Sequence, residues 1–147
     1  HKVVVVVGTR VDALPVATYR EDMLGEGNPR TVLIGQTQAV LRERGFEVVG
    51  SRISDAPSPS TGEVVALIRA NKAEAAVIVV LNWVDVSSIR AMGRAEVFLE
   101  AGLVSPNGDL LWRKDSRTVS SISMYQSQTD YSSYLRKAVI DAVKEVP

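Results

Sequence analysis

Six residues could form a ligand site, because they stand where two strongly apolar stretches end. Residues 2–7 read KVVVVV and residues 75–86 read AAVIVVLNWVDV. Such stretches are typical of strands buried in an open α/β sheet, which binds ligands at the carboxyl ends of its strands. The predicted site consists of Gly8, Thr9, Arg10, Asn82, Trp83 and Asp85. Their hydroxyl, guanidinium, amide and carboxylate groups would hydrogen-bond a small molecule.

The same residues have an interpretation that needs no ligand. Neither of the glycine-rich phosphate-binding motifs follows Gly8, and glycine readily serves an ordinary turn. Trp83 would cover the edge of the core, since an indole is commonly mostly buried. The sequence leaves both interpretations open.

Catalytic machinery is not evident in the sequence. His1 is the sole histidine and stands at the start, where a purification-tag remnant explains it, and cysteine is absent. The serine pairs at 87–88 and 120–121 have no histidine base and no G-x-S-x-G elbow. The acidic residues lack the spacing of a metal site or a glycosidase pair. We predict no enzyme activity, no catalytic residue, no metal site and no cofactor.

The charge balance argues against nucleic acid as a partner. Seventeen basic and seventeen acidic residues cancel over 147 residues, so no overall field attracts polyanions. The length suits one domain, residues 1–147, with a single core. No signal peptide and no apolar stretch of about twenty residues is visible. We expect either a cytoplasmic chain or one that begins after a removed leader.

Strands and helices alternate in the first half of the chain. After the long connection at 11–28, a capping box at Ser60 and Glu63 marks the start of the second helix. The expected elements are a strand at 2–7, a helix at 29–44, a strand at 46–49, a helix at 60–72 and a strand at 75–86. This βαβαβ order requires parallel strands joined by right-handed crossovers. The simplest arrangement places the first strand between the other two, with one helix on each face.

The second half predicts an antiparallel hairpin and a carboxyl-terminal helix. The strands at 93–104 and 110–120 flank a turn at 106–108 that contains proline and glycine. A helical spacing of apolar residues from 131 to 146 predicts the last helix. The fold class is therefore α/β: a mixed five-stranded sheet of order 2-1-3-4-5, βαβαβ followed by an antiparallel β-hairpin and a C-terminal helix.

The hairpin carries a candidate interface. In the simplest register Glu100 lies opposite Lys114, and Trp112 lies opposite Gly102. One face of the hairpin then holds the leucines at 99, 103 and 111, and the other face holds the residues of the predicted interface. They are Phe98, Val104 and Trp112. Because one terminal helix cannot cover both faces, we predict that this set joins an oligomeric or partner interface, unless another part of the chain folds over it.

Three stretches resemble a group of bacterial envelope lipoproteins. They are IGQTQAVLRERGFEVV at 34–49, KAEAAVIVVLNWV at 72–84, and residues 97–112, which end in SPNGDLLW. The group includes the amino-terminal domain of TolB, the periplasmic domain of the curli secretion channel, the Pel exopolysaccharide-export lipoprotein and neisserial lipoproteins. The first strand departs from the group, since it continues as VVGTRVD where many members have a proline-phenylalanine or double-proline segment.

The resemblance implies a non-enzymatic periplasmic component of an envelope assembly or export system, associated with the outer membrane. Its partners would be copies of itself or other envelope and export proteins. Contact with the membrane would come only from a lipid anchor upstream of residue 1. The alternative function is a small-molecule-binding, flavodoxin-like or receiver-like α/β domain in the cytoplasm, which would use the predicted ligand site.

Overall fold

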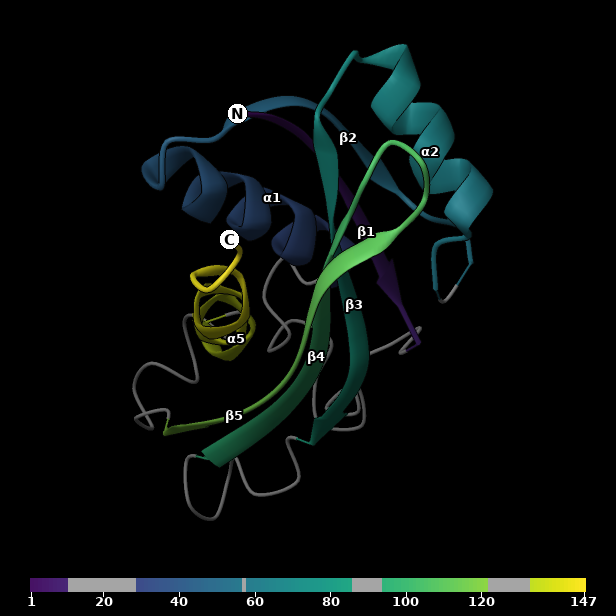
Figure 1. Ribbon diagram of the computed structural model, residues 1–147. Coiled ribbons are helices and arrows are strands. Elements are labelled where there is room, and N and C mark those ends of the chain that lie inside the picture. The colour runs from purple at the N-terminus through teal and green to yellow at the C-terminus, as the bar shows by residue number, and fades with distance from the viewer. Residues whose placement is uncertain (11–28, 57, 86–93, 122–132) are drawn as a thin grey trace.

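The computed structural model describes residues 1–10, 29–56, 58–85, 94–121 and 133–147, which form one five-stranded sheet and three helices (Figure 1). The strands are β1 (Lys2–Thr9), β2 (Glu47–Ile53), β3 (Ala75–Asp85), β4 (Arg94–Val104) and β5 (Leu110–Ser121), and the helices are α1 (Pro29–Glu43), α2 (Thr61–Ala70) and α5 (Ser133–Val143). The strand order β2-β1-β3-β4-β5 confirms the predicted fold class. As predicted, β1 pairs in parallel with β2 and β3, and the hairpin strands are antiparallel. The connection at 11–28 lies outside the described residues.

Both faces of the central strand β1 are covered, which explains its run of valines. Helices α1 and α5 lie on one side of the sheet and α2 lies on the other (Figure 1). Val3, Val5 and Val7 belong to the core cluster beneath α1 and α5. Val4 and Val6 belong to the second cluster, beneath α2. Because successive side chains of a strand point to opposite faces, an unbroken apolar run is needed where both faces are buried.

Helix α5 covers the same face as α1, a point that the sequence left open. It packs against α1, β4 and β5. Its buried residues follow the predicted helical stripe: Leu135, Ala138, Val139, Ala142 and Val143. Arg44, just after α1, donates a hydrogen bond from Nη1 to the carbonyl oxygen of Val143 at 3.2 Å, which ties the carboxyl ends of the two helices together.

Strand β2 is longer than predicted. The sequence indicated an end at Gly50, but the strand continues to Ile53, which pairs with Val7. The extra length follows from β1, whose carboxyl half provides hydrogen-bonding partners for residues beyond Gly50. A register shift between Val3 and Val4 accommodates the change of alignment along this edge.

The hairpin register differs from the predicted one over most of its length. Val104 lies opposite Leu110, as predicted, but Leu103 lies opposite Trp112. The intervening Leu111 is therefore an extra residue, and it is 59% exposed rather than buried beside the other leucines. Beyond it, Glu100 faces Asp115 instead of Lys114. The predicted register is wrong because a β-bulge next to the turn adds one residue to β5.

Candidate functional site

Gly8 and Thr9 lie inside strand β1 and not in a loop after it. Gly8 pairs with Val80 and Thr9 pairs with Leu81 of the neighbouring strand β3. Thr9 is 2% exposed. The backbone NH of Arg10 continues the ladder by donating to the carbonyl oxygen of Leu81 at 2.9 Å. The first two residues of the predicted ligand site are therefore used by the sheet.

Arg10 and Asn82 are brought together at the ends of β1 and β3. Arg10 Nη1 donates to Asn82 Oδ1 at 2.5 Å and lies 3.8 Å from Glu100 Oε1 on β4. Sequence reasoning did not include Glu100 in this site. The sequence correctly placed Glu100 on the face of β4 away from the leucines. That placement was the signal that could have added Glu100 to the site. The guanidinium of Arg10 thus has protein partners on two other strands.

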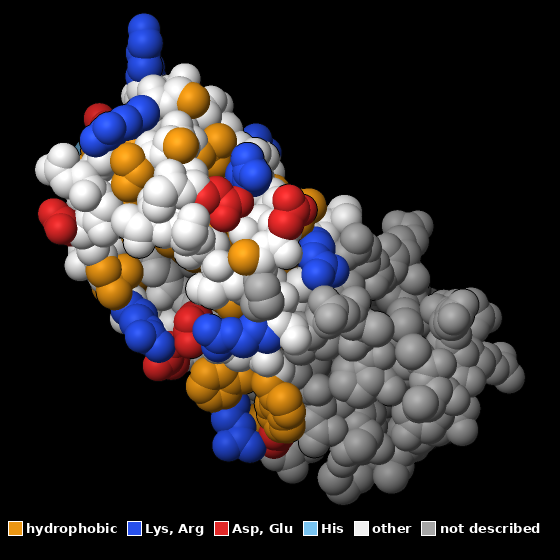
Figure 2. All heavy atoms as spheres, turned by 90° about the vertical axis from the view of Figure 1, so that its right-hand side faces the viewer, with side chains coloured by type: hydrophobic (Ala, Val, Ile, Leu, Met, Phe, Trp, Pro, Cys, Tyr) orange, Lys and Arg blue, Asp and Glu red, His pale blue; other side chains and the backbone are white. Residues whose placement is uncertain are grey.

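A band of ion pairs continues across the hairpin on the same side as α2. Arg113 Nη2 lies 3.3 Å from Glu100 Oε1 and 3.2 Å from Asp115 Oδ1. Arg117 Nη2 lies 2.9 Å from Glu96 Oε2. Acidic and basic side chains lie side by side on this side of the molecule, with hydrophobic groups beside them (Figure 2). The charges of this band are paired with one another. The band is therefore better suited to form a polar surface than to bind a free anion.

A shallow groove lies between this band and the segment that leads into α2. Its volume is about 180 Å³, below the range of about 300–1,000 Å³ that is usual for small-molecule pockets. Its lining residues are Ser58, Pro59, Ile78, Val80, Glu100, Ala101, Gly102, Leu110 and Arg113. The lining is mostly apolar in character, and its single acidic and basic side chains are already paired with each other.

Beside the Arg117–Glu96 pair of the band, toward the carboxyl end of β3, lies an apolar group that we call the sheet-end patch. It consists of Trp83, Phe98 and Val119. Trp83 is 44% exposed and Val119 is 41% exposed, and Phe98 is half-buried. Trp83 stands opposite Phe98 because an irregularity after Leu81 shifts the register of β3 against β4. Asp85, the last residue of the predicted ligand site, pairs with Glu96 along the backbone.

The three residues of the predicted interface do not share one face. Phe98 belongs to the sheet-end patch, but Val104 is buried in the core cluster beneath α2. Trp112 packs against the cluster on the opposite side, beneath α1 and α5. The grouping was wrong because it depended on the hairpin register, and the extra residue Leu111 turns Trp112 to the other face.

Two further features of the described residues bear on function. Among them, no group of three or more histidine, cysteine, aspartate or glutamate side chains could hold a metal ion. In the same part of the chain, none of the helices has the length and apolar character needed to cross a membrane.

Comparisons with known proteins identify the fold. No protein-family model matches the chain, and no curated protein matches it. The PelC dodecamer from Paraburkholderia phytofirmans superposes with a TM-score of 0.58 at 15% identity, over 97% of this chain and 84% of the PelC chain. A PelC variant gives a TM-score of 0.61 at 17% identity, over 95% and 83% of the two chains. This chain has the PelC fold.

A second solved structure shows the same architecture. The hypothetical protein CT253 from Chlamydia trachomatis matches with a TM-score of 0.63 at 11% identity, over 97% of this chain and 91% of that chain. At these identities the likeness shows the fold alone. PelC is the Pel export lipoprotein of the group that the sequence resembles, so the resemblance is confirmed at the level of the PelC fold.

Proposed function

We propose that this chain is a non-enzymatic domain of a cell-envelope assembly or export system, and that it associates with copies of itself. The observation that carries the proposal is the PelC fold, which in PelC itself is assembled as a dodecamer. A periplasmic location, with a lipid anchor upstream of residue 1, belongs to the same proposal.

The surface on the α2 side of the hairpin supports self-association. Helix α2 packs over β1 and β3 (Figure 1). The same side of β4 and β5 carries the ion-pair band and the sheet-end patch. Exposed tryptophan and arginine side chains are enriched where proteins bind one another. Trp83 and Arg117 supply these residue types at one end of the sheet, with the half-buried Phe98 opposite both of them in the strand pairing. We therefore place the self-association surface at the sheet-end patch.

The alternative, a small-molecule-binding domain that uses the ends of β1 and β3, has less support. Gly8 and Thr9 are part of a strand, and Arg10 already has Asn82 and Glu100 as partners. Both interactions use Nη1 of Arg10, so a ligand at this edge would share the guanidinium with Asn82 and Glu100.

Light scattering after size-exclusion chromatography, at several protein concentrations, tests self-association. We expect a mass of several chains for the parent protein and a lower mass, falling further on dilution, for the variant Trp83→Ser. Trp112→Ser is the matched control, because Trp112 packs on the opposite face against the core. It should lower the melting temperature and leave the mass unchanged. A parent protein that is monomeric throughout would contradict the proposal.

The location requires a separate experiment on the full gene product in its native cell. We expect it in the membrane fraction, released in soluble form when the segment upstream of residue 1 is removed. Recovery of the full product in the cytoplasmic fraction would contradict an envelope role and favour the alternative function.

A further inference from the structure

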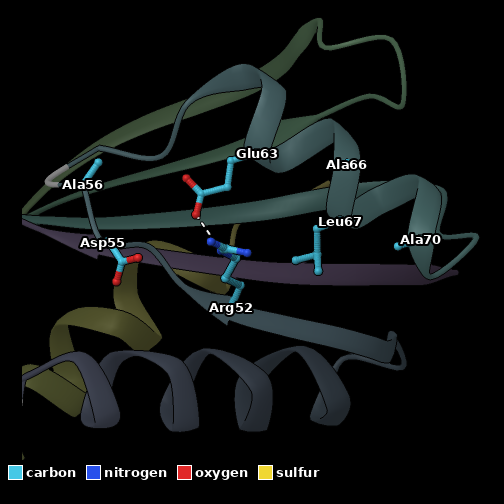
Figure 3. A pocket seen from close by; sticks show the side chains of 7 residues that line it. All are labelled: Arg52, Asp55, Ala56, Glu63, Ala66, Leu67 and Ala70. Carbon is cyan, nitrogen blue, oxygen red and sulfur yellow. Dashed lines mark hydrogen bonds and ion pairs between the residues drawn. The ribbon is translucent and has the colours of Figure 1, made fainter.

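A larger pocket, open to solvent and lined mostly by exposed residues, lies between the carboxyl end of β2 and helix α2. Its volume is about 560 Å³, within the range of about 300–1,000 Å³ that is usual for small-molecule sites. Its lining residues are Arg52, Asp55, Ala56, Glu63, Ala66, Leu67 and Ala70 (Figure 3). The charged side chains gather toward one end of the cavity, and Leu67 and Ala70 lie toward the other (Figure 3).

The charged end is built around Glu63. Ser54, which is 2% exposed, donates from Oγ to Glu63 Oε2 at 3.0 Å and accepts the backbone NH of Ala56 at 3.3 Å. Arg52 Nε donates to Glu63 Oε1 at 2.7 Å. Both carboxylate oxygens of Glu63 therefore have partners. Its backbone NH completes the cap of α2 by donating to Ser60 Oγ at 3.2 Å.

Two groups of opposite charge at this end still have bonding capacity. The Nη1 and Nη2 groups of Arg52 have no partner in the described part of the chain. Among the same residues, neither carboxylate oxygen of Asp55 has a partner. Because Nε is held by Glu63, the plane of the Arg52 guanidinium is constrained before any ligand binds. A donor that is already oriented loses less conformational entropy on binding.

We propose that this cavity binds a free amino acid with an aliphatic side chain. The ligand carboxylate would accept hydrogen bonds from the Nη groups of Arg52, which suit a planar anion. Its ammonium group would pair with Asp55. Its aliphatic side chain would lie against Leu67 and the methyl groups of Ala66 and Ala70, where apolar surface is removed from water. This site is separate from the sheet-end patch, so the proposal of ligand binding is independent of the proposal of self-association.

The probe is L-leucine, titrated while the backbone amide signals are followed by nuclear magnetic resonance. We expect saturable shifts at Ala66, Leu67 and Ala70. Two analogues test the two charges: L-leucinamide lacks the carboxylate, and 4-methylpentanoate lacks the ammonium group. Each should bind at least about tenfold more weakly, since one hydrogen bond to a charged group is lost. Absence of saturable shifts with L-leucine, or equal binding of all three compounds, would overturn the proposal.

Substitutions at and near the charged end of the pocket test which side chain contacts which group of the ligand. Asp55→Asn should weaken L-leucine binding about tenfold or more and leave the affinity for 4-methylpentanoate unchanged. The matched control is Glu43→Gln, an exposed acid at the end of α1 on the other side of the sheet. Ala66→Leu, at an exposed position, should fill the cavity and abolish the shifts without loss of melting temperature. If Asp55→Asn and Glu43→Gln bind L-leucine equally well, the assignment of the ammonium site is wrong.

Discussion

The side chain of Asn71 lies directly against the backbone of Gly50. A Cβ atom built on Gly50 would come within 2.7 Å of both Cγ and Nδ2 of Asn71. Asn71 holds this position because it caps α2, with Nδ2 donating to the carbonyl oxygen of Leu67 at 2.9 Å. The carboxyl end of α2 can approach β2 this closely only where the strand has no side chain.

Replacement of Gly50 by alanine should therefore destabilise the fold. The added methyl group would push Asn71 away and break its bond to Leu67, at a cost of about 1–2 kcal/mol in the free energy of unfolding. Gly35→Ala on α1 is the matched control, because nothing lies within 4 Å of its Cβ position. It should stabilise the protein by about 0.5–1 kcal/mol through helix propensity. Equal urea midpoints for the two variants would contradict the packing of Asn71 on Gly50.

Thr37 on α1 carries a buried hydroxyl that costs stability. Its side chain is 0% exposed, and Oγ1 has no hydrogen-bond partner among the described residues. Thr37→Val keeps the shape and removes the unsatisfied group, so it should raise the free energy of unfolding by about 1–3 kcal/mol. Thr31→Val, at an exposed position of the same helix, should change it by less than about 0.5 kcal/mol. A destabilised Thr37→Val variant would mean that the hydroxyl does have a partner.

Lys114 links β5 to the carboxyl-terminal segment. Its Nζ lies 2.6 Å from Glu145 Oε2 and donates to the carbonyl oxygen of Asp141 at 3.0 Å. The hydrogen bond and the charge of Lys114, with a smaller effect of Lys144, lower the pKa of Glu145. Because the folded-state pKa lies below the unfolded one, this stabilisation is present above the unfolded pKa and is lost as the pH falls through the folded pKa.

Denaturation of the parent and of Glu145→Gln across the acidic range measures this effect. The parent should be the more stable at pH 7, and the difference should close as the pH falls below the ordinary pKa of glutamate. Glu43→Gln serves as the control, since Glu43 is exposed and belongs to no ion pair in the described chain. A Glu145→Gln difference that stays constant with pH would contradict the pairing with Lys114.

The large features of the fold could be predicted from the sequence because the buried faces of strands and helices require apolar residues at regular spacings. The unbroken apolar runs in β1 and β3 indicate strands covered on both faces, and the helical spacing around Val139 indicates α5. The end of β2 could not be predicted in this way. Glycine commonly ends a strand, but β1 pairs with β2 beyond Gly50, and Asn71, which caps α2, occupies the space where a side chain at this position would lie.

The hairpin register and the candidate site depend on contacts that no pattern of neighbouring residues in the sequence indicates. Leu110, Leu111 and Trp112 are all apolar, so either register places one of them beside Leu103. The partners of Lys114 come from the segment around α5, and the pairing of Arg10 with Glu100 joins β1 to β4. The cavity between β2 and α2 was missed for the same reason, since Arg52 and Glu63 come together only when α2 packs on the sheet.

The central position of β1 has a consequence for the nascent chain. Residues 3–7 are five consecutive valines, a segment of high β-propensity that has neither charge nor proline and that readily joins other chains. Both strands that bury it come later: β2 begins at Glu47, and Ala75 of β3 is the partner of Val3. The hairpin of β4 and β5, in contrast, closes across a short turn. The valine segment is therefore made before either of its partner strands, and the yield of folded protein depends on keeping it apart from other chains until β3 has been synthesised.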